Sequence, residues 1–481
     1  MNSSQSKDFN IKNLMIFFSL LLIIYVFIRA YFLSFTIDEA ISFSIINGNT
    51  EWESKANNHV LNTFLMATSK ALFGNNELAL RLPNVLSFIL YLVGLYNILK
   101  FSKDKMLLLL VISLAVLNPF LLEFFSLARG YGLATGFFMM SLFFFIKQDT
   151  DNYLPYDFFK DFILSMLFAS MAMHSNLTLI NFFISLMVVF SIKYLIIRKK
   201  KKQQLIHDIT FFTISLAFLL PLFWGIKRLL LLKKIDELYY GAPSFNYSAE
   251  SIINASLYFS GYPSWIITII KNIILLLFGM GILSVIIKKE YNSSLTMMIT
   301  LIIVILVELF SEHWLFSAKF PLERTALFYI PLLSVYVYFL FQHLFIHYKF
   351  NKWIYNIFIG LSTVILLINF FKGINFEYTK TWRFDSHTKD AMKIVKHNSM
   401  NLDRKLSISC YPLFSSTIDF YINIWNLNIM PAIKISDTTH TLNSDFVYRL
   451  DDNSAIDNFK VISTYNDINS NLLMNINTKQ K

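Results

Sequence analysis

The chain has 481 residues, of which 55% are hydrophobic, 17% aromatic and only 15% charged. A soluble protein carries about 25% charged residues, so this composition excludes an ordinary soluble enzyme and is typical of a chain that crosses a membrane several times. The net charge of +11 reflects lysines and arginines in short loops, which membrane orientation explains without a nucleic-acid partner. Cys410 is the only cysteine, which excludes a disulfide framework and a multi-cysteine metal site.

Long apolar runs follow one another through the first three quarters of the chain. A helix needs roughly 20 apolar residues to cross the hydrocarbon core of a membrane. About eleven spans are therefore expected, at residues 14–35, 82–99, 106–122, 131–146, 162–176, 178–197, 209–226, 265–287, 295–310, 325–346 and 353–371. The first run is too long for a signal-peptide core and has no small-residue cleavage site, so we expect it to be retained. The predicted fold class is an all-α polytopic membrane bundle.

Basic residues between these spans predict the orientation, because short cytoplasmic loops are enriched in lysine and arginine. With the N-terminus in the cytoplasm, the inner loops contain Lys100, Lys103, Lys105, Arg198 through Lys202, Lys288, Lys289, Lys349 and Lys352. An odd number of spans then places the residues after 371 outside the cytoplasm. The expected localisation is the bacterial inner membrane.

Two domains are expected: a transmembrane domain over 1–371 and a small extracytoplasmic α/β domain over 372–481. The tail mixes helix-like and strand-like segments, the helices at 388–398 and 415–425 and the strands at 406–410, 446–450 and 459–465. The transmembrane domain has two long outer connections, 36–81 and 227–264. The second contains Arg228 and Tyr240 and is compatible with either a mobile lid or an inert loop.

Two adjacent carboxylates stand where the first span ends, in the stretch SFTIDEAISF. Asp38 and Glu39 are compatible with two solvated loop acids. Ionisable residues at a membrane boundary are, however, often functional. A partly desolvated carboxylate there has the raised proton affinity that a general base needs.

Three arginines each precede an apolar run on the outer side, where the orientation bias does not place basic residues. They are Arg81 in LALRLPNVLSF, Arg129 in FSLARGYGLATGF and Arg324 in FPLERTALFYIPLL. Each is compatible with pairing to a local acid, namely Glu77, Glu123 or Glu323. Three on one face favour a shared anion, because the planar guanidinium binds phosphate through parallel hydrogen bonds. Gly130 and Gly132 would let the backbone approach a head group closely.

His59 precedes a segment, VLNTFLMATSKALFG, that is apolar on one face and too short to span. Such a segment is typical of an amphipathic helix lying in the membrane interface. His59 could position a substrate or bind a metal with the acids, although a lone loop histidine more often does neither. A divalent cation shared by the acids is compatible with the pattern, but no ligand set is specific enough to assign one.

The motifs TIDEA, NNHVLNTFLMATSKALFGNNELALRLPNVLSF and SLARGYGLATGFFMMSLFFF resemble those of bacterial GT-C superfamily membrane glycosyltransferases. The chain is most similar to the family 39 branch, which includes the protein O-mannosyltransferases and the aminoarabinose transferase of lipid A. The resemblance covers roughly residues 14–150, and FPLERTALFYIPLL adds a later match. It implies transfer of a sugar from a polyprenyl-phosphate carrier to a lipid, glycan or protein acceptor on the outer face of the membrane.

Carried onto this sequence, the resemblance implies that Asp38 is the general base and that Glu39 assists it. The histidine of the first outer loop falls on His59, in His59-Val60-Leu61, where the family usually has His-Pro. Arg129 and Arg324 would bind the carrier phosphate, and Arg81 and Tyr131 are counted with the substrate-binding residues. A single base, with attack by the acceptor oxygen opposite the leaving group, implies inversion at the anomeric carbon.

Other membrane functions share some of these features. A lipid-linked glycan flippase or transporter would usually show paired halves and broken helices near the midplane, and neither is evident. A polysaccharide polymerase would share the outer arginines, and a non-catalytic scaffold would leave the outer charges idle. The sequence does not reveal which sugar is moved, the acceptor or the oligomeric state.

Overall fold

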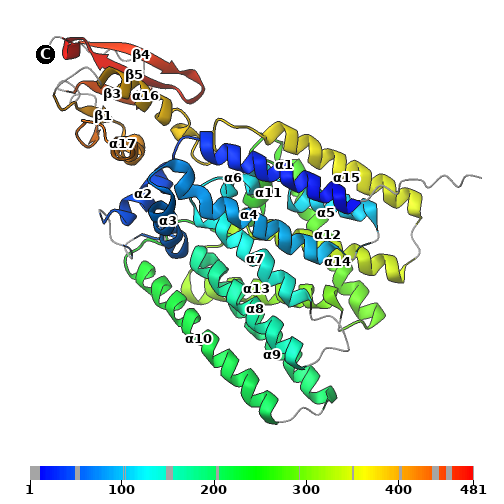
Figure 1. The fold of residues 1–481 in the computed structure, drawn as a ribbon. Helices are drawn as coiled ribbons and strands as arrows, with labels where there is room; N and C mark the ends of the chain where they lie inside the picture. The colour runs from blue at the N-terminus through cyan, green and yellow to red at the C-terminus, as the bar shows by residue number, and fades with distance from the viewer. Residues whose placement is uncertain are drawn as a thin grey trace, which may run out of the picture. The chain divides into compact units, whose positions relative to one another are not determined.

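The computed structural model describes residues 11–48, 52, 55–100, 102, 104–147, 155–201, 205–291, 293–348, 351–399, 404–435, 444–450 and 458–479. Most of the described chain is helical (Figure 1). The first fifteen α-helices are α1 Ile11–Phe32, α2 Ile37–Ile46, α3 Val60–Phe73, α4 Glu77–Leu99, α5 Lys105–Ala115, α6 Pro119–Phe125, α7 Gly130–Ile146, α8 Pro155–Ser175, α9 Ile180–Lys201, α10 Leu205–Lys234, α11 Phe245–Ser256, α12 Ser264–Lys288, α13 Ser294–Phe316, α14 Tyr329–His347 and α15 Lys352–Gly373.

The chain divides into two compact units. We call the first the helical unit; it consists of Met1–Phe27, His59–Asn62 and Pro83–Ile374. We call the second the mixed unit; it consists of Ile28–Asn58, Thr63–Leu82 and Asn375–Lys481. The C-terminal residues thus form one unit together with most of the first outer connection.

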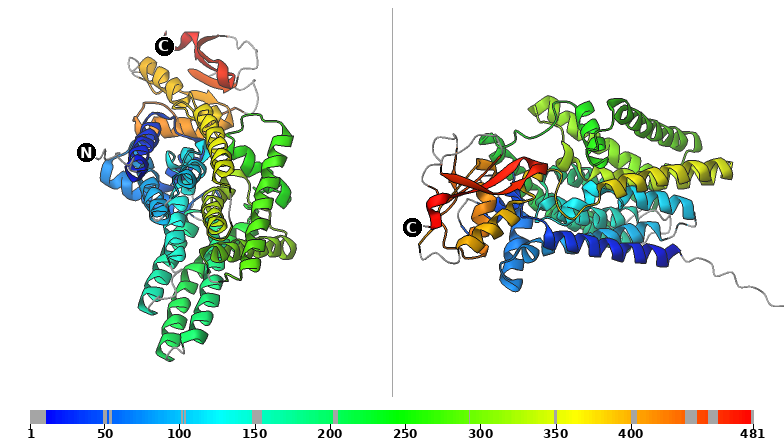
Figure 2. Two further views of the ribbon diagram at one scale, coloured as in Figure 1. Left: turned by 90° about the vertical axis from the view of Figure 1, so that its right-hand side faces the viewer. Right: turned by 90° about the horizontal axis from the view of Figure 1, so that it is seen from above.

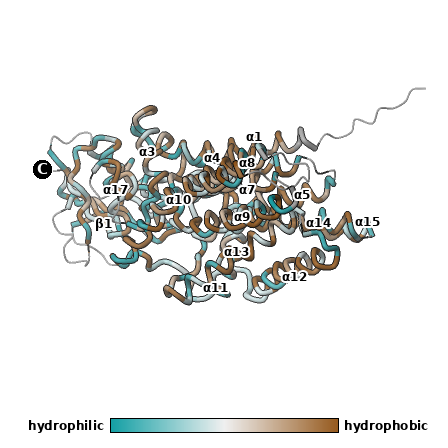
Figure 3. Tube along the Cα trace, turned by 90° about the horizontal axis from the view of Figure 1, so that it is seen from below, coloured by the Kyte–Doolittle hydropathy of each residue, from teal (hydrophilic) through white to brown (hydrophobic). Residues whose placement is uncertain are grey.

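Long apolar helices run alongside one another in the helical unit (Figures 1 and 2). Many large apolar side chains of α10 and α12 are exposed, for example Phe223 and Trp224 of α10. Hydrophobic residues predominate along α12, α14 and α15 (Figure 3). Continuous exposed apolar surface on helices of this length requires lipid around it. The protein is therefore a multi-pass membrane protein.

Among the described residues, eight helices are long and apolar enough to cross a membrane, or nine if one bent pair counts as a span. The expected count of about eleven is therefore not confirmed. The expected span 131–146 falls on α7, which has 17 residues and is buried along most of its length. The span expected at 162–176 falls on α8, whose first turns carry charged residues.

The expected continuous span 106–122 is wrong in detail, because the chain bends there by 59° between α5 and α6. Pro119 occupies the first turn of α6, and the side chain of Asn118 caps its N-terminus by accepting the N–H of Leu121 at 3.0 Å. Proline lacks the N–H that would continue the preceding helix, whereas it is well tolerated at a helix start. The sequence therefore ends one helix and begins another.

The expected outer connection 227–264 is largely helical. Helix α10 continues to Lys234, and α11 occupies Phe245–Ser256. Of the basic residues expected in inner loops, Lys103, Lys202 and Lys349 lie outside the described residues.

The mixed unit contains the small C-terminal sheet, with strands in the order β2-β1-β3-β5-β4. Its later elements are α16 Thr388–Ser399, β1 Ile408–Cys410, α17 Pro412–Ile424, β2 Ile433–Lys434, β3 Phe446–Leu450, β4 Phe459–Tyr465 and β5 Ser470–Asn475. Strand β1 pairs in parallel with β2 and β3, whereas β5 pairs antiparallel with β3 and β4. The α/β character predicted for the tail is confirmed, including β3 and β4 at the expected positions.

Candidate functional site

Helix α2 begins with a capping box that Thr36 and Glu39 form. The Thr36 hydroxyl accepts the Glu39 N–H at 3.4 Å, and a Glu39 carboxylate oxygen accepts the Thr36 N–H at 2.9 Å. Such a box satisfies two orphan donors at a helix N-terminus. Asp38 and Glu39 thus lie in the first turn of α2, where the helix dipole favours negative charge.

Arg81 forms a fully buried ion pair with Glu39. Its Nε and one terminal nitrogen donate to the two carboxylate oxygens at 2.8 and 2.7 Å. The remaining terminal donors bond the carbonyls at the end of the first helix, namely Ala30, Leu33 and Ser34. All five N–H donors therefore have acceptors, so Arg81 would have to give up one of these bonds to contact a substrate.

The Asp38 carboxylate is held by the side chain of an amide residue. Its Oδ1 accepts a hydrogen bond from the Asn57 side chain at 2.7 Å, and the residue is 7% exposed. Glu39, by contrast, is fully buried.

Asp385 is a third acid in this region of the mixed unit, and the sequence did not single it out. Its two oxygens accept the Ile37 N–H at 2.7 Å and the Thr417 hydroxyl at 3.0 Å. Burial raises the pKa of Asp385 well above its usual value, these hydrogen bonds oppose the rise, and the nearby charges of Asp38 and Glu39 add to it. Asp385 therefore caps α2 by accepting the Ile37 N–H.

His59 belongs to the helical unit and is 7% exposed. A backbone hydrogen bond to Ser175 holds the ring, while Nε2 is buried and has no hydrogen-bond partner among the described residues. Burial lowers the pKa of His59 well below its usual value, and the charges of three arginines lower it further. The imidazole is therefore neutral, with an acceptor lone pair on Nε2.

The three arginines that act on His59 are Arg129, Arg228 and Arg324. They come from the start of α7, the last turns of α10 and the short 3-10 helix Glu323–Ala326. We call these three residues and His59 the arginine cluster. The sequence predicted two of its arginines as anion ligands and placed Arg228 in a connection compatible with either a lid or an inert loop.

Two tyrosines border the arginine cluster. The ring of Tyr131 lies 4.5 Å from that of His59 and 5.8 Å from the Arg129 guanidinium carbon. The Arg324 guanidinium carbon lies 4.6 Å from the ring centroid of Tyr240. Cation–π contacts of this kind hold a guanidinium while leaving its edge for hydrogen bonding. Tyr131 was predicted as a substrate-binding residue, whereas Tyr240 was not.

The backbone beside Arg324 is in an uncommon conformation. Glu323 has a φ of +44°, and its carboxylate accepts the Tyr240 hydroxyl at 3.2 Å. Non-glycine residues with a positive φ are uncommon, and they often occur at functional sites. Ala242 and Phe320 fix the same segment through paired backbone hydrogen bonds of 2.8 and 3.0 Å.

Buried asparagines support the chain before Arg129. The Asn62 side chain donates to the Ala128 carbonyl at 2.9 Å, and Asn84 donates to Asn62 at 2.7 Å while accepting the Leu133 N–H at 3.0 Å. Sequence reasoning missed this network. The signal was the presence of asparagine in otherwise apolar helices, because buried polar groups must find partners.

Gly130 and Gly132 allow other parts of the protein backbone to approach α7 closely. A Cβ on Gly130 would collide with the Ser175 carbonyl and with Cβ of His59, and one on Gly132 would collide with the Phe124 carbonyl. The two glycines therefore let α7 pack tightly beside the arginine cluster.

Replacing Gly130 with alanine should lower the free energy of unfolding by about 1–3 kcal/mol, because the added methyl overpacks a rigid contact. Gly279 of α12 has open space around its Cβ position and serves as the control; Gly279→Ala should leave stability equal or slightly higher. Thermal unfolding of the purified variants in detergent measures both. Equal stability of the two variants would show that the atoms around Gly130 move aside at little cost in free energy.

The predicted site residues thus form two groups. Asp38, Glu39 and Arg81 lie in the mixed unit, together with Asp385. The other group lies in the helical unit and comprises His59, Arg129, Tyr131 and Arg324.

Comparison with known proteins gives a match by structure alone. No protein-family model and no curated protein matches the sequence. The crystal structure of ArnT from Cupriavidus metallidurans in the apo state is similar, with 10% identity, coverage of 96% of this chain and 98% of that chain, and a TM-score of 0.52. The structure of ArnT from the same organism bound to undecaprenyl phosphate has 11% identity, covers 96% and 97% of the two chains, and has a TM-score of 0.53. The chain therefore has a fold similar to that of ArnT.

Proposed function

We propose that the protein is a membrane glycosyltransferase that moves a sugar from a polyprenyl-phosphate carrier to an acceptor hydroxyl. The observation that carries the proposal is the arginine cluster, in which the charges of three arginines act on the buried ring of His59. Arginine matches a phosphate group in charge and geometry. A structural neighbour that is bound to undecaprenyl phosphate supports the same class of ligand.

In the proposed reaction, the acceptor oxygen attacks the anomeric carbon while the bond from that carbon to the phosphate oxygen breaks. The bonding electrons leave with the polyprenyl phosphate, and Arg129 and Arg324 stabilise the charge that develops on it. Asp38 takes the proton of the acceptor hydroxyl. Attack opposite the leaving group inverts the anomeric configuration.

The supporting residues have distinct proposed roles. Glu39 and Arg81 position Asp38 by fixing the start of α2, since both are saturated by contacts within the protein. Tyr131 supports the donor site beside His59. The proposed location is the bacterial inner membrane with the C-terminal residues outside the cytoplasm, as the basic loops predict.

Replacing Arg129 or Arg324 with glutamine should weaken binding of undecaprenyl phosphate by about 10- to 100-fold, because a hydrogen bond to a charged group contributes about 1.5–3 kcal/mol. Arg198 provides a matched control, since it is half exposed and pairs with Asp208. Arg198→Gln should bind the lipid like the wild type. The measurement is a titration of the purified variants with undecaprenyl phosphate in detergent; unchanged affinity in both cluster variants would contradict the proposed phosphate site.

A further inference from the structure

A second group of ionisable side chains lies in the helical unit, at the end of α14 far from the arginine cluster. Arg324 precedes α14, whereas His343 and His347 lie in its last two turns. The 19 residues of α14 extend about 28 Å at the helical rise of about 1.5 Å per residue. The histidines therefore do not belong to the proposed donor site.

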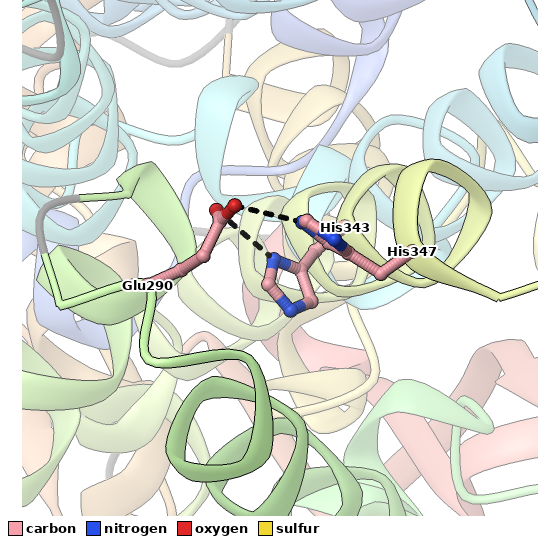
Figure 4. A group of neighbouring side chains, drawn as sticks. All are labelled: Glu290, His343 and His347. Atoms are coloured by element: carbon pink, nitrogen blue, oxygen red, sulfur yellow. Dashed lines mark ion pairs between the residues drawn. The ribbon is translucent and has the colours of Figure 1, made fainter.

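The two histidines face one carboxylate. His347 Nε2 lies 3.0 Å from one oxygen of Glu290, and His343 Nδ1 lies 3.9 Å from the other. Figure 4 shows both imidazole rings beside this carboxylate. A spacing of four residues places both rings on the same face of the helix, which is the arrangement that helical metal sites use.

Glu290 is held in place by its backbone. Its N–H donates to the Val285 carbonyl at 3.3 Å, and its carbonyl accepts the Thr296 hydroxyl at 2.6 Å and the Ser293 hydroxyl at 3.2 Å. The preceding residue, Lys289, ends α12 in the left-handed conformation. The turn between α12 and α13 therefore presents Glu290 to α14 in a defined position.

An ion pair alone does not account for His343. The residue is 4% exposed, and its Nε2 is buried without a hydrogen-bond partner among the described residues. A buried polar nitrogen without a partner is costly, and such groups call for an explanation such as an ion.

We propose that Glu290, His343 and His347 bind a divalent transition-metal ion of the zinc class. The ligand atoms all lie within 4.8 Å of one another. Zinc bonds to nitrogen and oxygen are about 2.0–2.2 Å, so two ligands of one ion lie at most about 4.4 Å apart. The Glu290 side chain, which is 40% exposed, closes the remaining gap by a small rotation.

The ligand chemistry selects the class of ion. Two imidazoles and one carboxylate suit zinc, cobalt or nickel, whereas calcium and magnesium prefer a shell of oxygens. Water completes the coordination. The ion would join the α12–α13 turn to the end of α14, so it would stabilise the helical unit by binding only the folded state. This proposal does not depend on the transferase reaction.

The test uses tag-free, full-length protein in detergent, stripped of metal with a chelator and then titrated with Co²⁺ and Zn²⁺. We expect one Co²⁺ per chain with a visible absorption band, and a higher unfolding temperature with Zn²⁺. His343→Ala, His347→Ala and Glu290→Gln should each lower the affinity at least about tenfold, since even losing a residue behind a metal ligand costs about 10–100-fold.

The control is His397→Ala, which removes an exposed histidine of α16 and should bind metal like the wild type. Wild-type protein without saturable Co²⁺ binding would overturn the proposal, whatever the variants do. Equal affinity in Glu290→Gln and the wild type would also overturn it. The proposal would also be overturned if His347→Ala lost the same amount of stability with and without Zn²⁺. In that case His347 would stabilise the protein only through its ion pair with Glu290.

Discussion

Replacing Asp38 with asparagine should lower the rate of sugar transfer by about 100- to 10,000-fold, the range that a general base contributes. Asparagine keeps an oxygen that can accept the Asn57 hydrogen bond, but it cannot take a proton from the acceptor. Binding of undecaprenyl phosphate should be unchanged, because the proposed phosphate ligands are arginines. Transfer of labelled sugar from polyprenyl phosphate in membranes measures the first effect, and lipid titration measures the second.

Asp390→Asn is the matched control for Asp38→Asn. Asp390 is exposed on α16 and pairs with Lys393 one turn later, so its loss should leave transfer at the wild-type rate. Normal transfer by Asp38→Asn would remove Asp38 from the reaction. Movement of the sugar-lipid across the membrane without any transfer would instead support a flippase.

The sequence was informative wherever a local pattern determines the structure. The strands β3 and β4 were predicted because their β-branched and aromatic residues stand between polar turns. The apolar runs predicted the membrane helices, because a segment that crosses the water-free core of a membrane must be apolar and must satisfy its own backbone hydrogen bonds. The number of spans was predicted less accurately, because α7 is shorter than a usual span and because Pro119 interrupts the expected span at 106–122.

The candidate site was predicted less completely, because its contacts join residues that are far apart in the chain. Nothing near Asp385 indicates that its carboxylate caps a helix that begins at Ile37. Arg228 and Tyr240 were placed in a connection compatible with either a lid or an inert loop, yet one acts on His59 and the other packs on Arg324. Such pairings follow from tertiary packing.

The two acids of the TIDEA motif also illustrate what a sequence leaves open. Asp38 and Glu39 are adjacent and chemically similar, so their order along the chain does not separate a base from a structural group. The guanidinium of Arg81 separates them, because it engages both oxygens of Glu39. This partner of Glu39 lies 42 positions away in the chain.

Replacing Arg81 with methionine should lower the free energy of unfolding by about 3–5 kcal/mol, because it leaves the buried charge of Glu39 without its partner. The double variant Arg81→Met with Glu39→Met should recover much of this loss, since apolar residues of similar volume often replace a buried ion pair at little cost. Arg198→Met removes a half-exposed arginine and should change stability by less than about 1 kcal/mol.

Unfolding of the three variants in detergent measures these differences, and transfer by the double variant then separates two roles for Glu39. If Glu39 only positions α2, a stable double variant should transfer sugar more slowly through misplacement of Asp38, but its rate should keep the wild-type dependence on pH. A changed pH dependence would mean that Glu39 itself exchanges a proton during the reaction. Equal stability of Arg81→Met and the wild type would show that the ion pair does not hold the start of α2. The Asp385 cap and the Asn57 hydrogen bond would then be the contacts that position Asp38.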